Sequence, residues 1–221
     1  MSKLEKITLT CKECGKESEF TIWRSINTML DPEMKSAVRD RSAFRFTCPH
    51  CGKSAPVDYS FLYHQMEDKI MIYYAQTDED EKDIRGIFTG KANMPFFEDL
   101  QKDKYLNRIV RSLNQLFEKL AILDAGLDDR IVEICKVIIR SDYQEKHPES
   151  EKTELLMYTS DDNKHIFLIL ENGKAACSAQ LTDDIYSTIK KHFSPRLKDI
   201  RDEDEPVIDQ AWALKFISES K

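Results

Sequence analysis

Four cysteines in two matching motifs are the residues of this 221-residue chain best suited to chemistry. The motifs are CKEC at 11–14 and CPHC at 48–51, each is followed by Gly-Lys, and 33 residues separate them. Thiolate sulfur is a preferred ligand of Zn²⁺, and two C-x-x-C pairs at this spacing are typical of a closed tetrahedral site. The motifs therefore predict one structural zinc ion per chain, held by Cys11, Cys14, Cys48 and Cys51.

The glycines after the two pairs, Gly15 and Gly52, support this interpretation. A turn that points both sulfurs at one ion needs a positive φ after the second cysteine, and glycine adopts that φ without steric cost. Two disulfides, four buried thiols or a C-x-x-C redox centre are the alternatives. Residues 1–6 resemble no secretory signal, so we expect a cytoplasmic protein. The cytoplasm is reducing, which favours metal ligands over disulfides.

The other candidate residues are two cysteines and two histidines. Cys135 and Cys177 have apolar or small neighbours, so we expect buried, inert thiols. His64 or His165, with a nearby carboxylate, could serve an enzyme of unrecognised type. No sequence motif supplies a nucleophile with its base, and six glycines in the whole chain disfavour a phosphate-binding loop. We therefore assign no catalytic and no cofactor-binding residues beyond the zinc ligands.

The charge and hydrophobicity of the chain indicate which classes of macromolecule it could bind. The chain is 41% hydrophobic and 33% charged, with a formal net charge of −7, and no apolar run approaches the ~20 residues that span a bilayer. The acidic excess is concentrated in residues 61–100 and 151–221. Negative charge disfavours phosphate backbones, so a protein partner is predicted and a membrane is not. Nucleic acid is the alternative, through basic and aromatic side chains on one face: Arg24, Arg39, Arg41, Arg45 and Lys53 with Trp23, Phe44 and Phe46.

Alternating and helical patterns around the cysteines predict a zinc ribbon with a helical insertion, in a first domain at 1–95. Strand-like segments enter and leave each C-x-x-C turn, which gives two hairpins. Asp31-Pro32 is a helix start. The expected elements are strands at 7–10, 20–23, 43–47, 55–59 and 70–74, helices at 31–39 and 61–66, and a solvated acidic loop at 77–83.

A second domain is predicted at 96–221, which makes the chain α+β overall. Apolar residues at spacings of three and four predict a helical hairpin over 103–142, with Gly126 ending its first helix. Asn172-Gly173 is a strong signal for a tight turn between strands. The other elements are a three-stranded antiparallel meander over 153–181 and helices over 182–219, the first capped by Thr182 and the last opened by Glu205-Pro206.

The first domain resembles the CpXC family of bacterial proteins, named for its Cys-Pro-X-Cys motif. The matching segments are CKECG (11–15), WRSIN (23–27), LDP (30–32), FRFTCPHCG (44–52) and LYH (62–64). The first pair has Lys12 where the family has proline, and this residue is not a ligand. The segment 120–137 also resembles the helical extension of longer members. The resemblance implies a cytoplasmic bacterial protein with the same four ligands, and it implies no activity.

Three functions are consistent with the sequence. The first is a non-catalytic zinc-binding protein that serves as a module for protein interaction. It is supported by four ligands that leave no open position on the metal. The second is a transcription-associated or nucleic-acid-binding zinc ribbon, and the third is the enzyme that uses His64 or His165.

Overall fold

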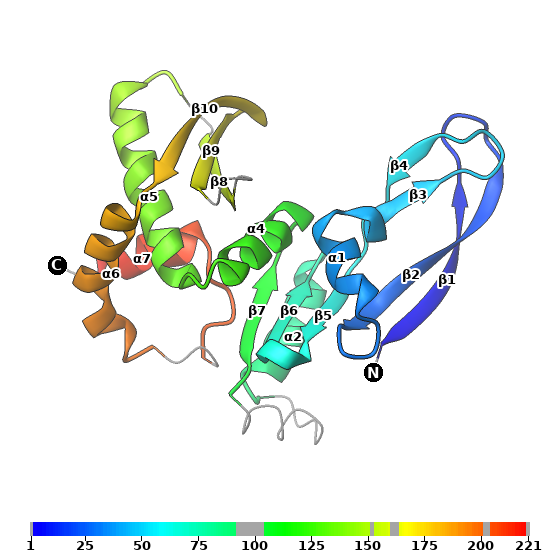
Figure 1. The fold of residues 1–221 in the computed structure, drawn as a ribbon, viewed down its shortest axis with the longest axis horizontal. Helices are drawn as coiled ribbons and strands as arrows, with labels where there is room; N and C mark the ends of the chain where they lie inside the picture. The colour runs from blue at the N-terminus through cyan, green and yellow to red at the C-terminus, as the bar shows by residue number, and fades with distance from the viewer. Residues whose placement is uncertain (1, 92–103, 151–152, 160–163, 201–203, 220–221) are drawn as a thin grey trace. The chain divides into compact units, whose positions relative to one another are not determined.

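The computed structural model describes residues 2–91, 104–150, 153–159, 164–200 and 204–219 (Figure 1). The chain forms two compact units, Met1–Leu113 and Asn114–Lys221. The domain boundary predicted between residues 95 and 96 lies outside the described residues. The α+β fold class, with the cysteine cluster near the N-terminus, a three-stranded antiparallel sheet and C-terminal helices, is confirmed.

Unit 1 is built on a five-stranded mixed sheet with the order β1-β2-β5-β6-β7. The pairs β1–β2 and β5–β6 are antiparallel, whereas β2–β5 and β6–β7 are parallel. Parallel pairing brings the carboxyl ends of β2 and β5 to the same edge of the sheet, where Asn27 is opposite His64. The strands are β1 (Lys3–Thr10), β2 (Glu17–Asn27), β5 (Phe61–Gln65), β6 (Ile70–Tyr74) and β7 (Leu106–Val110).

Two hairpins form the cysteine-bearing end of unit 1. β1 and β2 extend well beyond the rest of the sheet, and a short pair, β3 (Arg45–Thr47) and β4 (Ser54–Pro56), reaches toward the same end (Figure 1). We call the cysteine-bearing turns 11–16 and 48–53, together with β3, β4 and the adjoining parts of β1 and β2, the ribbon tip. The two predicted hairpins with a C-x-x-C turn each are confirmed.

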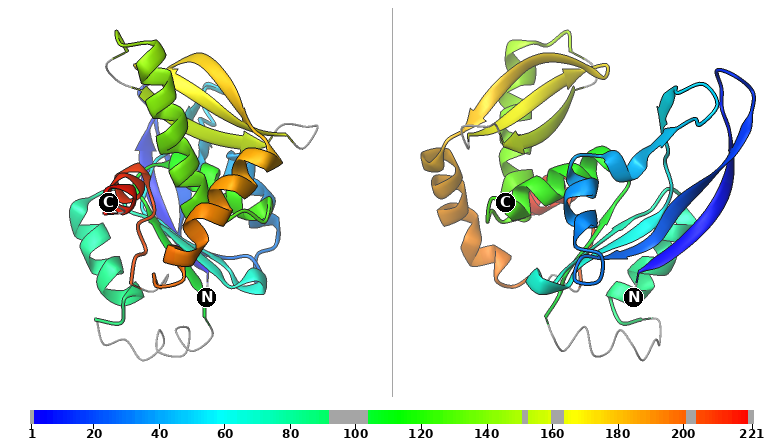
Figure 2. Two further views of the ribbon diagram at one scale, coloured as in Figure 1. Left: turned by 90° about the vertical axis from the view of Figure 1, so that its left-hand side faces the viewer. Right: turned by 45° about the vertical axis from the view of Figure 1, so that its right-hand side comes forward.

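Two helices cover opposite faces of the unit 1 sheet: α1 (Glu33–Arg39) and α2 (Asp78–Phe88) (Figure 2). α1 agrees with the predicted helix, although Pro32, not Asp31, occupies the cap position. α2 corrects the predicted loop at 77–83. Thr77 and Asp80 form a capping box that stabilises its first turn, and Ile84 and Phe88 are buried.

Segments 61–66 and 106–110 were predicted to be helical and are strands. Phe61–Gln65 is β5, held on one side by β2 and on the other by β6. Leu106–Val110 is β7, which pairs in parallel with β6, so the hairpin predicted over 103–142 begins only at Leu113. Backbone pairing with distant strands outweighs the local helical spacing in both cases.

Unit 2 packs helices on one face of a three-stranded antiparallel sheet with the order β10-β9-β8. Its core contains Ile131 and Cys135 from the longest helix, Phe167 and Ile169 from the central strand, and Phe216 from the last helix. The elements are α4 (Leu113–Asp124), α5 (Asp129–Lys146), β8 (Thr153–Thr159), β9 (His165–Glu171), β10 (Lys174–Leu181), α6 (Asp183–Leu197) and α7 (Gln210–Ser218).

Local sequence signals placed most boundaries of unit 2 correctly. Asn172 and Gly173 both have positive φ, 50° and 76°, as the predicted tight turn requires. Thr182 caps α6 through a hydrogen bond from the Ile185 N–H. The last helix is corrected: it begins at Gln210 and is capped by Asp209, four residues after Glu205.

Candidate metal centre

The two C-x-x-C turns have the same backbone hydrogen bonds. In the first turn, the Cys11 N–H donates to the Lys16 carbonyl at 3.0 Å and the Gly15 N–H donates to the Cys11 carbonyl at 2.9 Å. In the second, the Cys48 N–H donates to Lys53 and the Gly52 N–H to Cys48, both at 2.9 Å. The matching sequences therefore fold into matching turns.

Glycine is required in these turns by the backbone, not by lack of space. Gly15 and Gly52 have φ of +69° and +71°, in the left-handed region. A Cβ atom at either position would meet no heavy atom within 4 Å. The side chain of a larger residue would therefore meet no neighbour, but its backbone would be strained at this positive φ.

The turns bring the four predicted ligands into one cluster. The Sγ atoms of Cys11, Cys14, Cys48 and Cys51 all lie within 4.8 Å of one another. The Cys11–Cys51 and Cys14–Cys48 Sγ pairs are each 3.7 Å apart, and all four cysteines are free of disulfides. Among the described residues, this is the one cluster of histidine, cysteine or acidic side chains that could hold a metal ion.

The spacing of the sulfurs fits a single tetrahedral metal ion. Metal–sulfur bonds of about 2.3 Å, as in zinc–thiolate sites, give a tetrahedron with edges of about 3.8 Å. The two 3.7 Å sulfur pairs match this edge. The donor set and its spacing therefore suit one ion that takes four thiolates.

The ionisation of the four sulfurs favours a bound cation. Burial would raise the pKa of Cys48, but hydrogen bonds from the His50 and Cys51 backbone N–H groups, with those from neighbouring thiols, lower it to about 6. The backbone N–H of Lys53 favours the Cys51 thiolate, yet burial and the other three sulfurs raise the pKa of Cys51 to about 12. The negative charge of one thiolate thus disfavours ionisation of the next thiol, and a bound cation would offset this repulsion.

The ribbon tip has only a small apolar core. Cys11, Phe46 and Cys48 are buried, and the Phe20 and Phe46 rings meet edge to face at 5.7 Å. Leu9 and Val57 pack against this cluster. Two of the three buried residues are therefore metal-ligand candidates.

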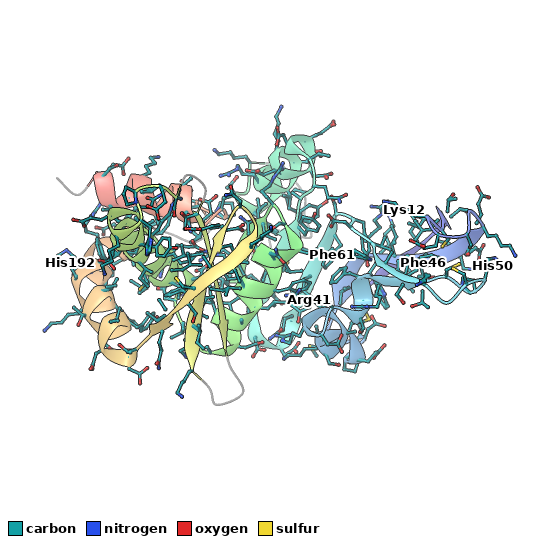
Figure 3. All side chains as sticks on the ribbon, turned by 90° about the horizontal axis from the view of Figure 1, so that it is seen from above. Lys12, Arg41, Phe46, His50, Phe61 and His192 are labelled. Atoms are coloured by element: carbon teal, nitrogen blue, oxygen red, sulfur yellow. The ribbon has the colours of Figure 1, made fainter. Side chains whose placement is uncertain are left out.

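The outer surface of the tip is polar. His50 lies at its end, beyond Phe46 (Figure 3), and Lys12 is exposed. His50 is exposed, its Nε2 lies 3.4 Å from the Glu17 carbonyl oxygen, and it is not one of the four residues of the cluster. Lys16 and Lys53 are also exposed.

Four residues of the predicted basic and aromatic face have other roles in the fold. Phe44 and Phe46 are buried, as core residues. Arg24 pairs with Glu5 at 2.7 Å. Arg39 donates to the Tyr63 hydroxyl at 2.8 Å and to Gln65 Oε1 at 3.0 Å, so it belongs to a network between α1 and β5.

The two candidate catalytic histidines have different surroundings. His64 is buried in β5, and its Nε2 lies 3.1 Å from the Tyr105 hydroxyl, which takes the place of the carboxylate that the enzyme hypothesis required. Burial lowers the pKa of His64. His165 is half-buried at the start of β9. His64 is therefore buried and in contact with Tyr105.

The two remaining cysteines differ from each other. Cys135 is fully buried in α5, as predicted, and burial raises its pKa to about 12. Cys177 was also predicted to be buried but is exposed on β10. The correction follows from sheet order, because β10 is an edge strand whose first residues face solvent.

One surface feature was not found from sequence. Met29, Leu30 and Met66 are 60%, 60% and 44% exposed, which is high for large apolar side chains. They lie just after the carboxyl ends of β2 and β5. The parallel pairing of two distant strands brings them together, and no local pattern signals that pairing.

Comparison with known proteins identifies the first half of the chain. A family profile described as CpXC protein matches residues 9–136. No curated protein and no solved structure matches the chain. Within the described residues, no helix has the length and apolarity needed to cross a membrane.

Proposed function

Taking as premise that this chain belongs to the CpXC family, we propose that it is a zinc-stabilised, non-catalytic module that binds another protein. The observation that carries the proposal is the closed shell of four sulfurs, Cys11, Cys14, Cys48 and Cys51. Catalytic zinc keeps one position open for water or substrate, whereas four thiolates leave none. The metal would then stabilise the ribbon tip and take no part in a reaction.

Zinc is the ion that suits this site best. Four thiolates in tetrahedral spacing select zinc or iron–sulfur chemistry, and a single site with edges near 3.7 Å has room for one ion. The proposed compartment is the cytoplasm, where reducing conditions keep the thiols available.

Binding to a protein is supported by the three exposed apolar side chains Met29, Leu30 and Met66, which we call the methionine ledge. Asn27 joins its two halves. Its Oδ1 accepts a hydrogen bond from the Met29 N–H at 3.0 Å, and its Nδ2 lies 3.9 Å from Met66 Sδ. Contiguous exposed apolar side chains are typical of interaction sites, and methionine adapts to varied partner shapes.

The ledge is held in place by charged and polar contacts. The Thr28 hydroxyl donates to Glu67 Oε2 at 2.7 Å, and the Lys35 ammonium lies 2.9 Å from Glu67 Oε1. The Thr28 N–H donates to the His64 carbonyl at 3.1 Å. Such anchoring reduces the entropy lost when a partner binds.

Nucleic-acid binding is the second candidate, favoured by the exposed Lys12, Lys16 and Lys53 around the ribbon tip. The net charge of −7 opposes it. Arg24 and Arg39, which the sequence offered for phosphate contacts, are engaged with Glu5 and with Tyr63 and Gln65.

A cross-linking experiment separates these candidates. A photoreactive amino acid in place of Leu30 should capture a protein from a bacterial lysate, and capture should survive nuclease treatment. The same group in place of Leu4, which is 55% exposed on β1, is the matched control and should capture little. Loss of every cross-link after nuclease treatment, or equal capture at both positions, would contradict the proposal.

A further inference from the structure

The four cysteines of the metal centre differ in exposure. Cys11 and Cys48, the first of each pair, are 6% and 1% exposed. Cys14 and Cys51, the second of each pair, reach the surface. One half of the shell is therefore packed against the tip core, and the other half faces solvent.

We propose that Cys14 and Cys51 are sites of modification by two-electron thiol oxidants of the peroxide class, and that their oxidation releases the metal. The inference rests on the metal site of the proposed function. It adds a chemical reaction of the metal ligands themselves. Of the four sulfurs, those of Cys14 and Cys51 are the nucleophiles that solvent can reach.

Accessibility and local charge both favour reaction at this pair. Reactive cysteines are thiolates in partly exposed, electropositive surroundings. Metal binding keeps the sulfurs deprotonated, and in the same two turns the exposed Lys12, Lys16 and Lys53 outnumber the exposed Glu13. Cys135 meets neither condition, because it is fully buried in α5.

The second step uses a sulfur that is already close. Attack of the Cys14 thiolate on hydrogen peroxide breaks the O–O bond and gives a sulfenic acid and hydroxide. The Cys48 thiolate, whose Sγ lies 3.7 Å away, then attacks that sulfur, so that a disulfide forms and a second hydroxide leaves. Cys51 and Cys11, also 3.7 Å apart, can react in the same way. Two peroxides thus accept four electrons, two disulfides form, and one divalent ion is released.

Loss of the metal should affect the tip and spare the rest of unit 1. The tip core consists of Cys11, Phe46 and Cys48 with a few partly buried neighbours. β3 and β4 have three residues each and pair only with one another. By contrast, β5 and β6 hold their own buried side chains, including Phe61, Tyr63 and Ile72. Oxidation therefore replaces the metal by two disulfides between the turns and leaves the adjoining sheet intact.

The test treats the metal-loaded full chain with hydrogen peroxide. We expect a chromogenic chelator to bind one released metal ion per protein chain after about two molecules of hydrogen peroxide have been consumed. A sulfenic acid trap such as dimedone should label Cys14 or Cys51 first. When the treated protein is unfolded and alkylated, Cys135 should still be reduced. Its thiol should be lost at least about tenfold more slowly than those of Cys14 and Cys51. Cys177→Ser, which removes an exposed thiol outside the shell, should leave metal release unchanged.

Two results would overturn the inference. One is that the sulfenic acid trap labels Cys11 or Cys48 before it labels Cys14 or Cys51. The second is metal that stays bound while Cys177 is oxidised. Protein that contains no metal when purified under reducing conditions would overturn the proposed function as well, so the two failures are distinguishable.

Discussion

The Lys136 ammonium lies 2.9 Å from Glu118 Oε2 between α5 and α4, and both side chains are almost completely buried. The pair is part of a longer series. Lys136 also lies 3.1 Å from Glu133, and Lys119 lies 3.5 Å from Glu133 and 2.9 Å from Asp129. Five buried charges therefore alternate in sign, which we call the ionic chain.

The ionic chain joins α4 to the neighbouring sheet. Glu118 uses its second oxygen to accept a hydrogen bond from the Met157 N–H of β8 at 2.6 Å. β8 is an edge strand, so this carboxylate satisfies a backbone donor that the sheet leaves unpaired. Burial raises the pKa of Glu118, whereas Glu133 and Glu118 raise the pKa of Lys136 against the effect of burial.

Removal of the Lys136 charge should strongly destabilise unit 2. Lys136→Met leaves Glu118 and Glu133 buried without their shared cation, and breaking a buried pair in this way costs about 3–5 kcal/mol. Urea unfolding followed by far-UV circular dichroism measures the loss. Lys146→Met is the control, because the Lys146–Asp142 pair is exposed and should contribute less than about 1 kcal/mol. Equal losses of unfolding free energy in the two variants would refute the stabilising role assigned to the ionic chain.

The sequence predicted the metal centre because its geometry is local. A C-x-x-C-G turn positions two sulfurs within a few residues, and the two turns share the same sequence pattern. Asn172-Gly173 and Thr182 are equally local, and the structure confirms both. Thr77 and Asp80 form a capping box, and their Thr-x-x-Asp spacing is equally local, although the acidic composition of the segment predicted a loop.

Strands that pair with distant partners could not be predicted in this way. β5 and β7 are short apolar segments whose state depends on parallel pairing with β2 and β6. The same dependence hides the methionine ledge, because Met29 and Met66 follow two strands that only this parallel pairing places side by side. The exposure of Cys177 depends on its edge position in the sheet, which composition does not reveal.

Glu67 should remain ionised to unusually low pH. Burial opposes its ionisation, but hydrogen bonds from the Thr28 hydroxyl and the Lys35 ammonium lower its pKa from 4.5 to about 2. A lowered pKa contributes stability that is present above the unfolded value of 4.5 and is lost as the pH falls through about 2. The contribution should stay below about 1 kcal/mol, because solvent screens this half-exposed side chain.

Titration of the Glu67 carboxyl carbon by NMR measures this directly. Lys35→Met should move the midpoint of the Glu67 titration upward, since one of the donors that stabilise the carboxylate is gone. Glu33→Gln, a change at an exposed carboxylate on the same helix as Lys35, should leave the Glu67 midpoint in place. A Glu67 midpoint at its ordinary value in the wild-type protein would show that the contacts do not persist in solution.

The second glycine should tolerate asparagine better than valine. Gly52 has a φ of +71°, and left-handed conformations cost about 1–2 kcal/mol for most residues but less for asparagine. Gly52→Val should therefore weaken zinc binding by about tenfold or more, and Gly52→Asn by less. Competition with a chelator of known affinity ranks the variants. Because a Cβ here meets no neighbour, equal affinities for all three proteins would mean that the turn adopts another backbone in solution.

Loss of one ligand should unfold the ribbon tip and leave the sheet beside it folded. Cys48→Ser removes the most deeply buried of the four sulfurs and should abolish stoichiometric zinc binding. Without the ion, three thiolates and a few apolar side chains cannot offset the entropy of ordering two hairpins. Amide hydrogen exchange should then lose protection in β3, β4 and the outer half of β1. Protection in β5 and β6 should persist, because Tyr63 and Ile72 are packed in a core that contains no ligand. Cys177→Ser controls for the loss of a thiol as such. Unchanged protection throughout the tip would show that the hairpins fold without the metal, and the closed shell would then need another explanation.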